Sequence, residues 1–150
     1  MDAELWMQAA LHQARLAEEK GEVPVGAVLV HQGEIIASGF NETILSCDPS
    51  AHAEIIAIRK AAAFCKNHRL IDTTLVVTLE PCAMCAGAMI QARVGKVIFG
   101  ASDPRAGAAG SVFQVLQNGA QNHRVEIVSG ILATTCRDML QDFFKAKRSR

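Results

Sequence analysis

Apolar residues recur at helical spacing near both ends of the chain. Residues 2–20 are predicted to form an amphipathic helix, because apolar side chains share one face when successive residues turn by ~100°. That face holds Trp6, Ala9, Ala10 and Ala17, with Leu5 and Leu16 on its flank. Asp2 is the expected N-cap and Gly21 the expected end of this helix. Near the C-terminus a stripe within ~60° predicts the core-facing side of a final helix. It consists of Leu132, Cys136, Met139 and Phe143.

The central part of the chain alternates strand patterns with helix patterns. The expected strands are 25–30, 34–38, 74–79, 96–99 and 125–128, and the expected helices are 51–64, 82–93 and a short one near 111–117. Gln32-Gly33 should join the first two strands as a hairpin. Strands that alternate with helices indicate βαβ crossovers. We therefore expect an α/β fold with a mostly parallel sheet and helices on both faces, in a single domain over residues 1–150.

Composition and charge narrow the classes of protein that the chain can belong to. Half of its 150 residues are hydrophobic and 20% are charged, so it can bury a core and disorder is excluded. Fifteen Lys and Arg balance fifteen Asp and Glu, so any nucleic-acid contact must come from a local patch. No stretch reaches the ~18 consecutive apolar residues of a membrane span. The acidic start Met1-Asp2-Ala3-Glu4 does not resemble a signal peptide, and we expect a cytoplasmic protein that does not associate with membranes.

The cysteines indicate metal chemistry. Five of them, an odd number, favour metal ligation or catalysis over a disulfide framework. Cys82 and Cys85 follow Pro81 and are three residues apart, so in a helix they lie only ~60° from each other and can hold one ion. A helix N-terminus lowers thiol pKa values, which favours the thiolates that zinc requires. His52 can supply a third, neutral ligand, and three protein ligands leave the fourth position open for catalysis.

Glu54 is the natural general base of such a site. On an ideal helix His52 and Glu54 point ~160° apart, so both can face one metal only if it lies beyond the N-terminal end of the helix. This requires two helix N-termini, at about Ala51 and Cys82, to point at one place beyond the carboxyl ends of the strands. Glu54 would then take a proton from an activated water and return it to the departing group.

Plainer interpretations exist for the same residues. The zinc could be structural, with Cys47 or Cys65 as a fourth ligand, and Glu54 would then be an ordinary acid of a first helical turn. Cys-x-x-Cys could be a redox pair. On local pattern alone Asn41 and Asp103 would be turn residues, and Cys136 a packing residue.

The combination His52-Ala-Glu54 with Pro81-Cys-Ala-Met-Cys85 resembles the signature of the zinc nucleobase deaminases. The flanking segments resemble, within that group, the bacterial tRNA adenosine deaminases. They are 22–28, 39–41, 48–54, 79–88, 107–111, 122–125 and 142–144. The resemblance implies a cytidine-deaminase-like three-layer α/β/α sandwich around a mixed, mostly parallel five-stranded sheet. It also implies one Zn²⁺ per subunit, a homodimer, and conversion of the wobble adenosine of a tRNA anticodon stem-loop to inosine.

The resemblance further implies roles for individual residues. Asn41 should hydrogen-bond the flipped base, Val23 and Leu79 should wall its pocket, and Asp103, Asn122 and His123 should lie near the anticodon-loop backbone. The residues of the tail add a separate argument. Four of the fifteen basic groups lie in the last six positions, namely Lys145, Lys147, Arg148 and Arg150. Phe144 lies ~100° from the core stripe of the final helix, so we predict that it stacks on a base beside Arg148.

Two other functions fit the same signature. The first is a deaminase of free nucleobases or nucleosides such as guanine or cytosine, with the same zinc chemistry. The second is a non-catalytic, zinc-stabilised RNA-binding subunit. Glu54 argues against the second, because a silent partner has no need of a proton shuttle.

Overall fold

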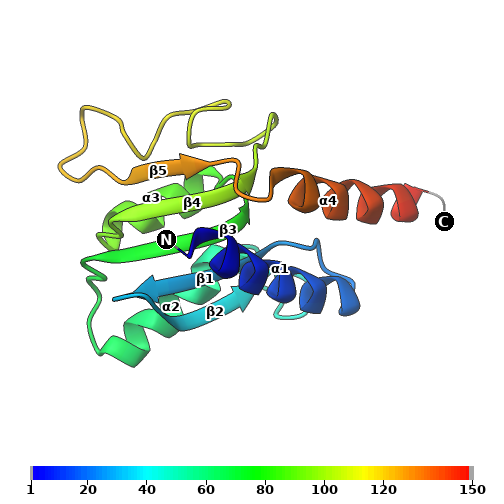
Figure 1. The fold of residues 1–150 in the computed structure, drawn as a ribbon, viewed down its shortest axis with the longest axis horizontal. Helices are drawn as coiled ribbons and strands as arrows, with labels where there is room; N and C mark the ends of the chain where they lie inside the picture. Colours follow the sequence, from blue (N-terminus) through cyan, green and yellow to red (C-terminus); the bar gives the residue numbers. More distant parts are fainter. Residues whose placement is uncertain (1, 149–150) are drawn as a thin grey trace.

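The chain folds into alternating helices and strands, and the computed structural model describes residues 2–148 (Figure 1). The helices are α1 (Ala3–Glu19), α2 (Ala53–Cys65), α3 (Ala83–Gln91) and α4 (Ala133–Arg148). The strands are β1 (Gly26–His31), β2 (Glu34–Phe40), β3 (Thr73–Leu79), β4 (Lys96–Ala101) and β5 (Glu126–Ser129). Arg150, one of the four basic residues of the tail, and the outermost residues of the predicted domain 1–150 lie outside the described residues.

The five strands form one mixed sheet in the order β2-β1-β3-β4-β5. Strand β1 is antiparallel to both of its neighbours, whereas β3, β4 and β5 run parallel. The predicted mixed sheet is confirmed, although its four pairings divide evenly between the two types rather than being mostly parallel. Because β1 runs backwards, its start lies at the same edge of the sheet as the carboxyl ends of the other four strands.

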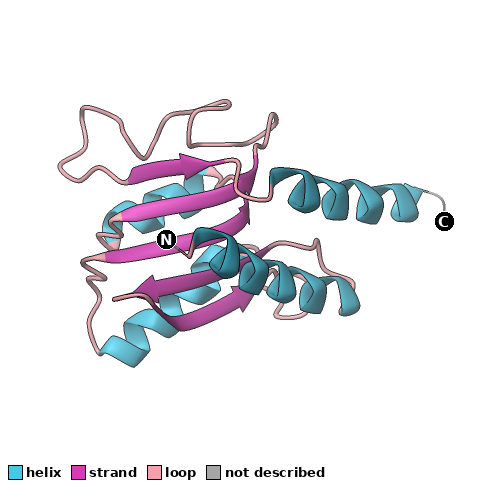
Figure 2. Cartoon of the chain, viewed as in Figure 1, coloured by secondary structure: helices cyan, strands magenta, loops and turns pink. Residues whose placement is uncertain are grey.

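Helices cover both faces of the sheet, which confirms the three-layer arrangement (Figure 2). Alternate residues of the central strand β3 face opposite layers, as the pleat of a strand requires. Leu75 and Val77 pack with residues of α2 and α3, whereas Val76 packs with residues of α1. Cys136 at the start of α4 belongs to the α1 layer, and the rest of α4 continues past the carboxyl edge of the sheet (Figure 1).

Close packing against β2 sets the position of the N-terminus of α2. A Cβ on Gly39 would lie 2.7 Å from the carbonyl oxygen of Ala53 and 2.9 Å from the amide nitrogen of Ala57. Only glycine therefore lets the first turn of α2 lie this close to the end of β2. The hairpin turn is also where the sequence predicts it, since Gln32 and Gly33 have φ values of 52° and 79°. Positive φ at both central residues is the requirement of a type I′ turn.

One expectation about helices is wrong, and the predicted face of α1 is confirmed at Ala10 and Ala17 but is not centred where expected. Residues 111–117 form no helix but belong to a loop with one isolated bridge, between Ala109 and Gln114. Val112 and Phe113 are exposed there, and the amides of residues 111–113 bond to the Glu80 carboxylate and the Gly107 carbonyl instead of forming a helical turn. In α1 the buried face is centred on Met7, Leu11 and Ala14, and Leu5 is 63% exposed.

None of the helices between residues 2 and 148 is long and apolar enough to span a membrane.

Candidate metal and catalytic site

Two helix N-termini meet at the carboxyl edge of the sheet. His52 is the N-cap of α2 and Cys82 the N-cap of α3, and both have extended backbone conformations. Cys85 lies in the first turn of α3 and is buried. Strand β3 ends at Leu79, three residues before Cys82, so the strand places the start of α3 directly. This is the convergence that the sequence predicted for a metal at this edge.

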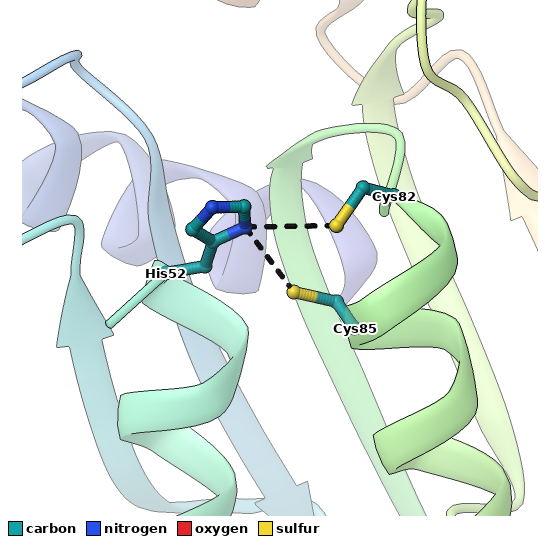
Figure 3. Close-up of side chains that lie close together, drawn as sticks. All are labelled: His52, Cys82 and Cys85. Atoms are coloured by element: carbon teal, nitrogen blue, oxygen red, sulfur yellow. Dashed lines mark hydrogen bonds between the residues drawn. The ribbon is translucent and has the colours of Figure 1, made fainter. Parts of the chain in front are cut away.

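The three side chains face one another (Figure 3). His52 Nδ1 lies 3.6 Å from Cys82 Sγ and 3.5 Å from Cys85 Sγ. In a tetrahedral zinc site, with Zn–S of about 2.3 Å and Zn–N of about 2.05 Å, a nitrogen and a sulfur ligand lie about 3.6 Å apart. One imidazole and two thiols are also a donor set that zinc prefers. The residues present therefore fit a zinc ion.

The two cysteines differ in their affinity for a proton. A hydrogen bond from Cys85, assisted by one with His52, lowers the pKa of Cys82 to about 4. The same bond to Cys82, together with burial, raises the pKa of Cys85. The hydrogen bond with Cys82 likewise raises the pKa of His52. Cys82 thus loses its proton more readily than Cys85, and because zinc binds cysteine as the thiolate, metal binding to both sulfurs releases protons.

Glu54 lies in the first turn of α2 and is only 4% exposed. Burial raises its pKa to about 7, against an ordinary value of 4.5, and the nearby Cys82 adds to this rise. A hydrogen bond from Cys85 acts in the opposite direction. A carboxyl group with a pKa near neutrality, next to the ligand group, can both take up and release a proton.

The structure does not support a fourth cysteine ligand. Within residues 2–148, the group of potential metal-ligand atoms that all lie within 4.8 Å of one another comes from His52, Cys82 and Cys85. Cys47 is exposed, and its sulfur donates to the carbonyl of Ile44 at 3.7 Å. Cys65 ends α2 at the opposite end from His52. The alternative of a four-ligand structural zinc site is therefore wrong for this arrangement.

A cavity of about 880 Å³ lies at the same edge of the sheet. Five of the predicted substrate-binding residues line it, namely Val23, Leu79, Asp103, Phe144 and Arg148. The loop 102–106 and one face of α4 complete its walls. The Phe144 side chain is 42% exposed, and its ring packs edge-on against Phe143 at a centroid distance of 5.4 Å. Cys136, by contrast, is buried in the core as predicted.

The other three predicted substrate-binding residues lie elsewhere. The half-buried Asn41 accepts a hydrogen bond through Oδ1 from the Ala53 amide at 2.9 Å, beside His52. It therefore stabilises the start of α2 as well as lying near the metal group. His123 bonds through Nε2 to the carbonyl of Val94 at 2.8 Å. Since Val94 precedes β4, the structure places His123 and its neighbour Asn122 at the opposite edge of the sheet, away from the cavity.

Sequence reasoning assigned no role to two buried carboxylates that order the loops around the site. Glu22, 1% exposed, accepts hydrogen bonds from Thr43 Oγ1 and from the amides of Ile44 and Leu45. Glu80, 2% exposed, accepts hydrogen bonds from the loop after β4. Burial acts to raise the pKa of Glu80, but hydrogen bonds, above all from Ser111, lower it overall. The available signal was an acidic residue beside an apolar strand in Leu79-Glu80-Pro81.

Comparison with known proteins agrees with this geometry. The chain belongs to the MafB19-like deaminase family, whose model matches residues 1–148. A Haemophilus influenzae protein named tRNA-specific adenosine deaminase is 49% identical over 97% of this chain and 84% of that protein. A Bacillus subtilis protein of the same name is 48% identical over 98% of this chain and 91% of that protein. Within the deaminases, the chain therefore belongs to the family of the tRNA-specific adenosine deaminases.

Solved structures share the fold. One comes from a study of A-to-I editing by tRNA:A34 deaminases at the wobble position of transfer RNA. It has a TM-score of 0.87 and 41% identity, over 90% of this chain and 98% of its own. A guanine deaminase from Nitrosomonas europaea has a TM-score of 0.82 at 24% identity, over 93% and 83% of the two chains. The second likeness concerns the fold alone.

Proposed function

We propose that this protein hydrolyses the wobble adenosine of a tRNA anticodon loop to inosine and ammonia. The observation that carries the proposal is the group His52, Cys82 and Cys85 with the buried Glu54 beside it. The names of its relatives at 48–49% identity support the choice of substrate. They favour a tRNA adenosine over a free nucleobase.

The chain's own residues would divide the reaction between them. His52, Cys82 and Cys85 would hold the zinc ion, one per subunit, which supplies a polarised water with a lowered pKa when it is bound. Glu54 would accept a proton from the attacking water and deliver it to the base as the amino group departs from C6. Its raised pKa suits this task because the same carboxyl group must gain and then lose a proton at neutral pH.

The cavity supports a proposal for how an unstacked base would be recognised. Val23 and Leu79 would contact the flipped adenine, and Asn41 would hydrogen-bond it. Phe144 offers an exposed ring for a neighbouring base, and Arg148, on the same cavity wall, offers a cation for a phosphate. Asp103 would lie near the anticodon-loop backbone. A loop substrate fits this arrangement, since extrusion of a base from a loop costs less than extrusion from a duplex.

We also propose that the protein is a homodimer and acts in the cytoplasm, where it would meet tRNA. The resemblance to the tRNA adenosine deaminases supports both statements. Exposed apolar side chains, among them Met84 and Phe113 at 41% and 52% exposure, are available for contact between subunits.

A turnover assay tests the proposed function. The zinc-loaded chain is incubated with an anticodon stem-loop that carries adenosine at the wobble position, and in parallel with free adenine, guanine and cytosine. Mass spectrometry should show conversion of adenosine to inosine in the stem-loop only. Turnover of a free base with an unchanged stem-loop would identify a nucleobase deaminase instead. A lack of turnover with tight binding of the stem-loop would indicate an RNA-binding subunit.

A further inference from the structure

Glu80 lies in the sequence between Leu79, which lines the cavity, and Cys82 of the metal group. It follows β3 directly, two residues before Cys82, and its side chain is buried. Its Oε1 accepts the amide of Asp103 at 3.0 Å and the hydroxyl of Ser111. Its Oε2 accepts the amides of Ala109 at 3.0 Å and Ser111 at 3.1 Å. Four donors from one loop, residues 102–111, thus converge on a single carboxylate.

Backbone hydrogen bonds beside Glu80 join β3 to the end of β4 and to the same loop. The amide of Glu80 donates to the carbonyl of Ala101 at 2.8 Å, and the amide of Ala108 donates to the carbonyl of Pro81 at 2.8 Å. The loop also packs tightly on the carboxylate, because a Cβ on Gly107 would collide with the carboxyl group of Glu80. These contacts leave the loop little freedom to move away from β3.

The part of the loop that Glu80 anchors faces the cavity. Residues 102–106 line it together with Leu79. The anchored amide belongs to Asp103, whose own Oδ1 accepts the amides of Arg105 at 2.9 Å and Ala106 at 3.3 Å. The position of this wall therefore depends on Glu80 through Asp103.

We propose that Glu80 is a positioning residue that fixes the 102–106 wall of the substrate cavity before substrate binds. The inference rests on the proposed function for the identity of the substrate. The ordering of the loop by Glu80 does not depend on that function. A preordered wall saves the entropy of ordering the loop on binding, so loss of the anchor should weaken substrate binding more than it slows chemistry. The four hydrogen bonds that Glu80 accepts come from the loop, and none of them involves Glu54, His52, Cys82 or Cys85.

Two substitutions at this anchor and one control separate positioning from general stability. Glu80→Gln replaces one acceptor oxygen by a donor that faces loop amides. Ser111→Ala removes a single donor from an exposed residue, so it should fold even where Glu80→Gln does not. Thr78→Val is the control, because it removes the buried bond between Thr78 Oγ1 and the Gly26 amide, 3.2 Å long, and none to the loop.

Four quantities are measured on the zinc-loaded full chain: zinc content, amide hydrogen exchange over residues 102–111, and KM and kcat on the stem-loop. Glu80→Gln should raise KM about tenfold, the loss expected for one or two charge-assisted hydrogen bonds. Its kcat should stay within about threefold, and its zinc content should not change. Ser111→Ala should raise KM by about twofold to threefold, and both variants should exchange loop amides faster. Thr78→Val should change neither loop exchange nor KM.

The proposal fails if Ser111→Ala leaves both the exchange of residues 102–106 and KM unchanged, whether or not Glu80→Gln folds. It also fails if Glu80→Gln lowers kcat and zinc content with KM unaltered, because Glu80 would then support the metal rather than the wall. Hydrogen exchange needs no substrate. The anchor is therefore tested even if the wild-type chain does not deaminate the stem-loop, an outcome that would overturn only the proposed function.

Discussion

His52 and Glu54 serve one site although an ideal helix would point them ~160° apart. The structure resolves this because His52 is the N-cap, with φ −73° and ψ 156°, and so lies outside the helical rotation. Glu54 occupies the first turn, where Cβ atoms lean toward the N-terminus. One extended residue at a helix boundary thus allows the proposed ligand and the proposed base to come from neighbouring positions.

Replacement of Glu54 by alanine should abolish turnover and leave the metal bound. Loss of a general acid–base group typically costs 10²–10⁴ in kcat, and Glu54 is not among the grouped donors. Turnover on the stem-loop and zinc content by atomic absorption are measured together. The exposed Glu34 supplies the control, Glu34→Gln, which should be unaffected in both. Loss of zinc from Glu54→Ala would make Glu54 a ligand and contradict its role as the base.

Glu54→Gln should stabilise the metal-free fold at alkaline pH. The folded pKa of about 7 lies above the ordinary 4.5, so between these values the folded chain binds more protons than the unfolded chain. The favourable contribution of Glu54 is therefore complete below pH 4.5 and is lost as pH rises through 7. The variant minus wild-type difference should grow over this window to on the order of 1–3 kcal/mol. Urea unfolding in chelator at pH 5 and pH 8 measures it, and a difference independent of pH would contradict it.

At the scale of elements, the ends of helices matter more than their centres. α2 begins where Gly39 allows close approach and where Asn41 accepts the Ala53 amide, and α3 begins after Pro81. α4 has a different role: Phe143 on one face is buried, whereas Phe144 on the next is exposed and lines the cavity. The one-residue step between core and cavity follows from the 100° turn per residue.

Phe144→Ala should weaken binding of the stem-loop by about fivefold to a hundredfold, the cost of one lost base stack of about 1–3 kcal/mol. Arg148→Ala should weaken binding and also reduce the slope of log K against log salt by about 0.7, as for one single-strand phosphate contact. Fluorescence anisotropy over a range of salt concentrations measures both effects. Phe64→Ala is the control, since Phe64 is 69% exposed near the end of α2 and away from the cavity. If Phe144→Ala binds as the wild type does while Arg148→Ala does not, the stacking role is wrong.

At the scale of the whole molecule, the reversed direction of strand β1 brings residues from distant parts of the sequence to the site. It brings Val23 and Asn41, which flank the β1–β2 hairpin, to the edge where β3 and β4 end. The ligand group then joins the N-termini of α2 and α3, two elements that the chain separates by the whole of β3. A bound metal should therefore contribute to global stability as well as to chemistry.

Removal of the metal should lower the unfolding free energy of the whole chain by at least about 2 kcal/mol, because binding to the folded state alone stabilises it. Thermal unfolding is compared with and without chelator for the wild type, Cys85→Ser and the control Cys47→Ser. Cys85→Ser should behave like the chelated protein under both conditions, whereas the exposed Cys47 should be replaceable without effect. Equal melting temperatures with and without chelator in the wild type would show that the metal does not hold the fold.

Much of this arrangement was predictable from local signals. The hairpin at Gln32-Gly33, the strand 74–79 and the cysteine pair after Pro81 all follow from short segments, and the structure confirms them. The helix predicted near 111–117 failed because long-range bonds to Glu80 and a turn at Gly107 take the amides of residues 111–113. The remote placement of Asn122 and His123 could not be foreseen, because a long loop carries no periodicity that reports its path.

The amino-acid sequence by itself determined the candidate ligands His52, Cys82 and Cys85, the carboxyl group proposed as the base, and the alternation of strands and helices, because each is recognised from short local motifs. Only the tertiary structure decided the reversal of β1, the cavity between Leu79, the 102–106 loop and α4, and the convergence of four donors on Glu80. Those features join residues twenty or more positions apart. Their geometry is set by the packing of both helical layers against the sheet, and this packing cannot be read from any single segment of the sequence.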